Sequence, residues 1–376
     1  MKKSVFGLAV FGAFNIAAHA EPTVSLYGIV DVAMRYDSDQ VAGKPRLAEV
    51  SGMVNTSRWG FRGTEDLGGD LKANFRLEGG FNPDTGTQAE SASLFDRRAT
   101  VGLSGKWGRL DIGRDMTFGW EFTPIYDPLG GALATPTPTS HASGRASLLV
   151  NGFMFVTNNP YNAAKLRDNN VKYEYTAANG LLIGLDYSFG ETAGDPTKKS
   201  GRQAALGYMK NDINVITSYD QLRDANDRQQ RIVVAGGNFK ATSALKVTLG
   251  YAAMTADALF AASSNAVSSS IPNYTSTFGV AANGKIKVAT TAGGVDYQVL
   301  PQVSLIGAVY NTRVSGDGIP ANDYNTYVVM SKYTLSKRTF LYASVDHETA
   351  TVNGGLTTVS GKRSNTGVTA GIQTRF

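Results

Sequence analysis

The chain has no cysteine among its 376 residues and only three histidines. The lack of cysteine excludes disulfides, thiolate nucleophiles and cysteine-ligated zinc or iron–sulfur sites. His347 begins a segment that starts like the zinc-binding helix motif but has no second histidine, and no Gly-x-Ser-x-Gly motif occurs. The net charge is only +5 and no Lys/Arg-rich run is present, so a nucleic-acid partner is not expected. We predict no catalytic site, no metal and no cofactor.

Long hydrophobic runs are also missing, except near the N-terminus. There, Lys2 and Lys3 precede an apolar stretch at residues 5–18, and Ala18-His19-Ala20 is a small-x-small cleavage signal. Residues 1–20 are therefore predicted to be a cleaved secretory signal peptide, followed by one domain over residues 21–376. The alternative, an N-terminal membrane anchor, is disfavoured because the stretch is shorter than the ~20 residues of a spanning helix. The mature chain is thus either soluble outside the cytoplasm or spans a membrane with strands.

The chain does show a regular alternation of apolar and polar residues. Residues 181–189 place Leu, Ile, Leu, Tyr and Phe on one face, and residues 71–81 set a largely apolar face against Lys72, Asn74, Arg76 and Glu78. Residues 24–36 and 368–376 alternate in the same way. Segments of about ten alternating residues separated by turns are typical of strands in an outer-membrane barrel, with one face toward lipid and the other toward the lumen.

Connections of two lengths alternate between these segments. Seven short turns are predicted at 66–70, 105–108, 177–180, 211–212, 240–243, 300–302 and 335–338. Eight longer polar segments are predicted at 37–56, 82–95, 115–168, 190–201, 222–229, 256–286, 313–323 and 349–364. Fifteen connections join sixteen strands, so the prediction is an all-β, 16-stranded antiparallel transmembrane β-barrel with its short turns on the periplasmic side. A large soluble β-sandwich or β-helix is the alternative, although aromatic residues near the predicted strand ends favour the barrel.

Five stretches of the chain resemble a known family. These are residues 25–36 (SLYGIVDVAMRY), 57–78, 97–114, 335–342 and the closing segment 371–376. Together they resemble the general bacterial porins of the β-proteobacterial type. The resemblance implies a homotrimeric pore for passive diffusion of small hydrophilic solutes, surrounded by outer-membrane lipid and lipopolysaccharide. It also implies a third external loop folded inward, and a terminal Phe376 that the barrel-assembly machinery recognises.

The predicted connection at residues 115–168 is much longer than a hairpin needs, which is typical of functional loops. It contains an apolar segment at 148–156 that a freely solvated loop would rarely contain. Part of the loop is therefore expected to pack, either on the inner barrel wall or on a neighbouring subunit. Glu121 and Asp127 are the loop acids expected to face the constriction.

Alternation also predicts which basic residues line the lumen. If Trp59, Phe61, Val101 and Leu103 face lipid, then the inward residues include Arg58, Arg62, Arg98, Lys72, Arg76, Arg109 and Lys172, with Arg167 close by. In the family that the chain resembles, a basic cluster lines the constriction, and Arg58, Arg98 and Arg167 match its arginines. Such a cluster would favour anions. If lumen acids balance it, the preference would instead be weak, absent or cationic.

Two other functions remain open at this point. One is a substrate-specific channel of the same fold with a binding site along the lumen. The other is a barrel enzyme or adhesin that uses its external loops, for which Asp346, His347 and Glu348 form the only candidate group near a strand end.

Overall fold

The computed structural model describes residues 23–41, 44–89, 93–132, 165–260, 280–353 and 361–376. The signal peptide predicted at residues 1–20 and the apolar segment at 148–156 lie outside these residues and stay predictions. The described elements are β1 (Thr23–Val41), β2 (Lys44–Ser51), β3 (Arg58–Gly68), β4 (Leu71–Asn82), β5 (Thr87–Gln88), β6 (Arg98–Gly105), β7 (Gly108–Met116), α1 (Phe118–Glu121), α2 (Thr123–Tyr126), β8 (Leu166–Thr176), β9 (Leu181–Ser188), β10 (Gly201–Lys210), β11 (Ile213–Arg223), β12 (Gln229–Lys240), β13 (Leu245–Asp257), β14 (Lys285–Leu300), β15 (Val303–Gly316), β16 (Ile319–Thr334), β17 (Thr339–Val352) and β18 (Gly361–Arg375). Within the described ranges, neither helix is long enough to cross a bilayer.

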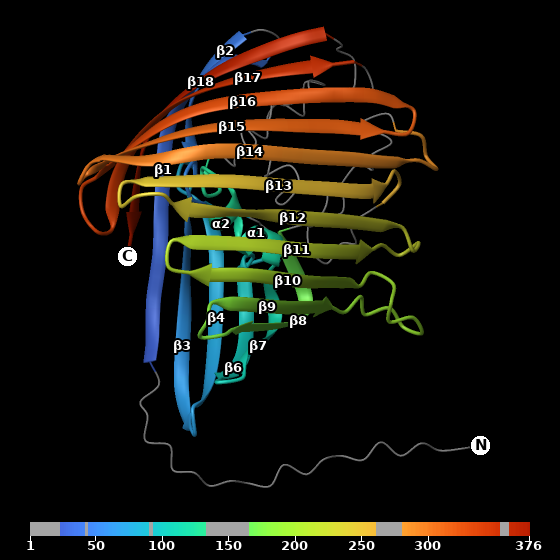
Figure 1. The fold of residues 1–376 in the computed structure, drawn as a ribbon. Coiled ribbons are helices and arrows are strands. Elements are labelled where there is room, and N and C mark those ends of the chain that lie inside the picture. Colours follow the sequence, from blue (N-terminus) through green and yellow to red (C-terminus); the bar gives the residue numbers. More distant parts are fainter. Residues whose placement is uncertain (1–22, 42–43, 90–92, 133–164, 261–279, 354–360) are drawn as a thin grey trace.

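The strands form one closed antiparallel sheet (Figure 1). Successive strands pair as hairpins, and β1 closes the ring because it pairs with both β18 and β3. Two of the eighteen strands are not staves of the barrel: β2 folds back on the upper part of β1, and β5 is a two-residue pairing with β4. The remaining sixteen confirm the predicted strand number.

The seven predicted short turns all join neighbouring strands in the structure. Positive φ angles occur where they were expected, for example at Gly180 (96°) and Asn211 (57°). Two predicted long loops are wrong. Residues 37–56 are mostly strand, because β1 continues to Val41 and β2 covers Lys44–Ser51. Residues 313–323 are also mostly strand, because β15 continues to Gly316 and β16 begins at Ile319 around a tight Asp317-Gly318 turn. Their polar composition resembles a loop because this part of the hairpin has polar outward side chains.

Side chains alternate between the outside and the inside of the barrel as predicted. On β1, Val24 and Met34 are exposed on the outer face, whereas Asp31 and Arg35 are buried inside the barrel. The same pattern holds on β9, where Leu181, Ile183 and Leu185 are exposed. Apolar residues therefore form the outer surface of a barrel without a second sheet, which excludes the soluble sandwich.

The inner face differs around the ring. From β1 to β8 it carries charged side chains, a region that we call the charged wall; β9 and β10 continue it with Asp186 and Gln203. From β11 to β16 the inward side chains are largely apolar and buried, a region that we call the apolar wall. Its members include Ile216, Ile232, Val234, Met254, Ile286, Val288, Ile306 and Met330.

The apolar wall is covered by the start of the loop that follows β7. Phe118, Phe122, Tyr126 and Leu129 join its side chains in one buried cluster. In Figure 1, α1 and α2 lie inside the ring of strands, and α2 contacts β11, β12 and β13. For the described part of this loop, the structure therefore favours packing on the inner barrel wall over packing on a neighbouring subunit.

Candidate functional site

Glycines on the inner wall create the space in which the third loop sits. A Cβ atom at Gly184 of β9 would lie 2.5 Å from the Phe118 ring, and one at Gly236 of β12 would lie 2.7 Å from the Tyr126 Cβ. A Cβ atom at Gly294 of β14 would similarly lie 2.5 Å from Pro128. Because these approaches need residues without side chains, the loop follows a track of glycines across the lumen.

Polar contacts fix the same path. The Phe118 N–H donates to Gln203 Oε1 on β10 (3.0 Å), and Asn238 Nδ2 on β12 donates to the Ile125 carbonyl (2.9 Å). Asp127 accepts from the Tyr310 hydroxyl of β15 and from the backbone N–H groups of Leu129 and Gly131. Asp127 is 2% exposed. It thus holds the loop to the apolar wall instead of projecting into open lumen.

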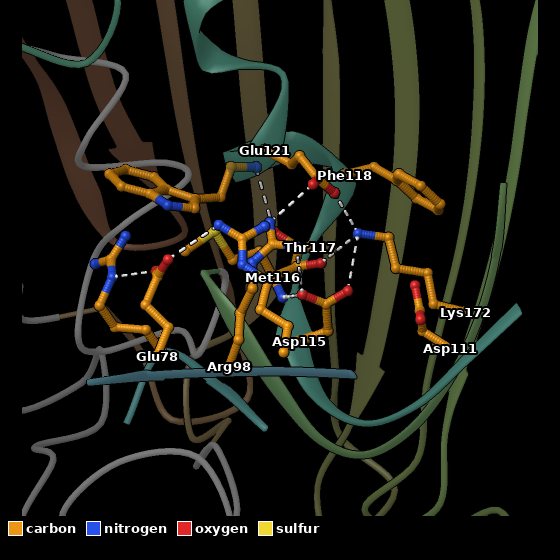
Figure 2. A network of polar contacts seen from close by, with 12 residues as sticks. Glu78, Arg98, Asp111, Asp115, Met116, Thr117, Phe118, Glu121 and Lys172 are labelled. Atoms are coloured by element: carbon orange, nitrogen blue, oxygen red, sulfur yellow. Dashed lines mark hydrogen bonds and ion pairs between the residues drawn. The ribbon is translucent and has the colours of Figure 1, made fainter. Parts of the chain in front are cut away.

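Four charged residues join the loop to the opposite, charged wall (Figure 2). Arg98 of β6 contacts Glu121 Oε1 of α1 (2.7 Å) and Asp115 Oδ1 of β7 (3.1 Å). Lys172 of β8 contacts Glu121, lies 3.6 Å from Asp115 Oδ2 and donates to the Met116 carbonyl (2.8 Å). We call Arg98, Asp115, Glu121 and Lys172 the loop clamp. Its two cations and two carboxylates balance, so its main effect is to fix α1.

Glu121 is held in its ionised form by the clamp. Burial would raise the pKa of this carboxyl, but the Lys172 ammonium and the Arg98 guanidinium outweigh burial and hold the pKa well below its usual range. Glu121 is therefore expected to stay ionised near neutral pH and to keep its ion pairs with Arg98 and Lys172.

A second group of charged residues lies beside the clamp, and its positive charges outnumber its negative ones. Glu78 of β4 is shared by Arg97 (2.7 Å), Arg76 (3.0 Å) and Arg58 (3.9 Å). Its carboxylate also accepts from the Tyr27 hydroxyl at 2.9 Å. Three guanidinium groups around one carboxylate leave a positive excess on this part of the charged wall.

Two further predicted cations extend this excess toward the short-turn end of the barrel. Arg62 is exposed and lies directly opposite Arg76 in the β3–β4 ladder. Lys72 is exposed and opposite Asp66, whose carboxylate accepts from the Gly68 N–H. Among the described residues, neither Arg62 nor Lys72 forms an ion pair with a carboxylate.

Arg167 lies opposite Asp115 in the β7–β8 ladder, but its own ion pair is with another strand. It forms an ion pair with Asp220 of β11 and is 3% exposed. The structure thus brings together Arg58, Arg62, Arg76 and Lys72 on β3 and β4 and places Arg98 and Glu121 in the clamp. Arg167 lies beside the clamp but pairs with Asp220, and Asp127 lies on the apolar wall. That all of these residues line a constriction stays a prediction.

Sequence analysis missed Asp115, Arg97 and Tyr27. Alternation along residues 109–115 and 27–35 places Asp115 and Tyr27 on the inward face, so that signal was available for both. Arg97 precedes β6, where no alternation applies.

Phe376 closes the seam between the first and last strands. Its backbone exchanges two 3.1 Å hydrogen bonds with Gly28, and a Cβ atom at Gly28 would overlap the Phe376 ring. The ring itself is half exposed on the outer surface. Its predicted recognition by the barrel-assembly machinery is not tested by this geometry.

Known proteins are similar to this chain in sequence and in fold. A family model described as "Gram-negative porin" matches residues 7–353. An outer membrane porin protein of Bordetella pertussis is 31% identical over 380 residues, which cover 91% of this chain and 93% of that protein. Outer membrane porin protein 32 of Delftia acidovorans is 34% identical over 253 residues, 66% of this chain and 65% of that protein.

A solved structure described as an anion-selective porin from Comamonas acidovorans has the same fold. It superimposes with a TM-score of 0.71 at 22% identity, covering 95% of this chain and all of that chain. The family match and the Bordetella relative extend over nearly the whole chain, so the barrel is a channel protein of the outer membrane and not a barrel enzyme. The chain belongs to the Gram-negative porin family.

Proposed function

We propose that the barrel is a water-filled pore for passive diffusion of small hydrophilic solutes and that it prefers anions. The observation that carries the preference is the unbalanced positive charge on β3 and β4. Arg58, Arg62, Arg76 and Lys72 project inward there, with Glu78 as the buried carboxylate among them. The Comamonas structure that shares the fold is described as anion-selective, which supports the same preference here.

The physical reason is the field inside a narrow bore. Charges of one sign on low-dielectric walls raise the local concentration of counter-ions, and a potential of a few kT changes ion occupancy by roughly tenfold. Charges that are already paired with carboxylates contribute little to such a field. The clamp residues Arg98 and Lys172 should therefore matter less for selectivity than the unpaired Arg62 and Lys72.

A salt gradient across a planar bilayer tests the proposal. The mature protein should give a zero-current potential of anionic sign, and Arg62→Gln combined with Lys72→Gln should move that potential toward zero. Arg202→Gln removes a charge from the exposed outer face of β10 and is the matched control, with no expected change. A wild-type potential of zero or of cationic sign would refute the preference.

The same recordings separate the alternatives. A substrate-specific channel would show saturable, solute-dependent block of its current for one solute class. An adhesin would bind its partner through the external loops, and that binding would persist when the lumen charges are removed.

The assembly state and partners belong to the same proposal. We expect a homotrimer, with outer-membrane lipid and lipopolysaccharide around the apolar outer surface, and we expect small anions as the main permeating ions. Cross-linking and the migration of unheated protein in detergent gels test the trimer.

Phe376 is proposed as the signal for the barrel-assembly machinery. Phe376→Ala should reduce the amount of barrel in the outer membrane, whereas Phe239→Ala should not. Phe239 is a suitable control because it is also an outward aromatic residue at the end of a strand, with a similar exposed fraction (48% against 47%). Equal losses in both variants would indicate a packing role.

A further inference from the structure

Arg62, Arg76 and Tyr27 form a distinct group just below the loop clamp, on its short-turn side. Arg76 is two residues nearer the β3–β4 turn than Glu78, which pairs in register with Arg98 of the clamp. Arg62 faces Arg76 directly across the ladder. We call Tyr27, Arg62 and Arg76 the lower arginine site.

The Tyr27 ring contacts both guanidinium groups and holds them close together. The Arg62 guanidinium carbon lies 5.3 Å from the Tyr27 ring centroid, and that of Arg76 lies 5.4 Å from it. Arg76 Nε also donates to the Tyr27 hydroxyl at 2.8 Å. Cation–π contacts of this kind orient a guanidinium without neutralising it.

Gly60 makes this arrangement possible. It lies between Tyr27 on β1 and Glu78 on β4 in the sheet register, and a Cβ atom there would lie 2.9 Å from the Tyr27 hydroxyl oxygen. Without that side chain, the Tyr27 ring crosses β3 and its hydroxyl reaches Glu78. The ring therefore has a fixed position under the two arginines.

The two arginines retain unused hydrogen-bond donors. Arg62 donates from Nε to Ser25 Oγ (3.3 Å), and no carboxylate pairs with it within the described chain. Arg76 uses Nε on Tyr27 and one terminal nitrogen on Glu78. Like charges directly opposite each other in a ladder destabilise a sheet, so an anion between them would remove a repulsion as well as accept hydrogen bonds.

We propose that the lower arginine site binds a small oxyanion with two negative charges, such as phosphate, either free or as part of an organic phosphate. Planar guanidinium groups match the oxygen spacing of phosphate and bind it through two parallel N–H···O bonds, whereas chloride is a single spherical acceptor and cannot present two spaced oxygens. The site rests on the proposed diffusion function, and it adds a saturable binding step below the clamp.

Single-channel chloride current with added inorganic phosphate tests the site. At constant ionic strength, maintained with acetate, phosphate should reduce the chloride current saturably, and glycerol phosphate should do the same if organic phosphates also fit. Arg62→Gln should raise the half-blocking phosphate concentration about tenfold, as expected for the loss of a charge-assisted hydrogen bond. Arg202→Gln on the outer face should leave it as in the wild type.

Arg62→Lys separates oxyanion recognition from charge. It keeps the positive charge, so the zero-current potential should move less than in Arg62→Gln, whereas the half-blocking concentration should still rise because the planar donor pair is lost. A phosphate effect no larger than that of acetate, or equal half-blocking concentrations for wild type and Arg62→Lys, would overturn the site. An anionic zero-current potential with either result would leave the proposed function standing.

Discussion

The two sides of the inner wall use the same barrel geometry for different purposes. On the charged wall, inward positions of β3, β4, β6 and β8 carry Arg or Lys, and some of these remain unpaired. On the apolar wall, inward positions of β11–β16 carry largely apolar side chains, and the described start of the third loop packs on β11–β15. Within the described residues, the loop packs on the apolar side and is joined to the charged wall by the ion pairs of the clamp, so the proposed aqueous path runs along the charged wall.

The largest difference between the two walls is expected when a carboxylate is placed on each of them in turn. Val234→Asp puts a carboxylate into the buried apolar cluster, where an unpaired charge costs several kcal/mol. Thr64→Asp adds the same group at an exposed inward position of β3 and should change stability by less than about 0.5 kcal/mol. Urea unfolding in lipid vesicles measures the free energy of unfolding of both variants. Similar losses of stability would show that water reaches the apolar wall.

Removing one partner of the clamp should have the next largest effect. Arg98→Gln leaves Glu121 and Asp115 without one cation, and loss of one partner from a buried ion pair costs about 3–5 kcal/mol. The loop should then become protease-sensitive and the open-channel current noisier. Lys106→Gln, which breaks an exposed pair with Asp70, is the control and should cost less than about 1 kcal/mol. Unchanged proteolysis in Arg98→Gln would mean that the apolar wall alone holds the loop.

The close approach of the loop to the inner-wall glycines can be tested by adding a methyl group on each face of the barrel. Gly184→Ala forces its Cβ atom into the Phe118 ring and should destabilise the barrel by about 1–3 kcal/mol through overpacking. Gly307→Ala adds the same atom on the outer face, where the nearest contact is an ordinary 3.9 Å to Val295, and should be nearly neutral. Thermal unfolding in detergent compares the two, and equal melting temperatures would argue against a close fit.

A loss of similar size is expected where the loop meets β15. Tyr310→Phe removes the hydroxyl that donates to the buried Asp127 and should cost about 1–3 kcal/mol. Tyr324→Phe removes an inward hydroxyl with no hydrogen bond among the described contacts, and its effect should lie within about 0.5 kcal/mol. Matching losses in the two variants would show that Asp127 does not depend on Tyr310.

The smallest effect is a predicted absence of pH dependence. A carboxylate whose pKa is lowered by folding contributes stability above its unfolded pKa, about 4.3 for Glu, and loses it only as the pH falls toward the folded value. Protease resistance of the third loop should thus be the same at pH 7 and pH 5. A loss at pH 5 that Glu121→Gln abolishes would show that this carboxyl titrates near its usual pKa.

Much of the barrel could be predicted because alternation with a period of two is a local property. The strand number, the seven short turns and the inward direction of Arg58, Arg62, Arg76 and Arg98 all follow from it. Alternation alone does not predict the apolar wall, because it assigns apolar residues to the outer face only. Runs such as residues 232–235 and 327–330 are apolar on both faces, which indicates burial on both sides. Which charges pair depends on the path of the loop, and no local pattern specifies that path.

The pairing of Gly28 with Phe376 implies that the barrel can close only after the last strand is present. Until the last residues of the chain are made, β1 has no partner on one side, and every shorter product presents two bare strand edges to its surroundings. Such edges recruit other chains. A chain that lacks β18 would therefore keep unpaired edges on β1 and β17, and the pairing of Gly28 with Phe376 is part of the step that removes them.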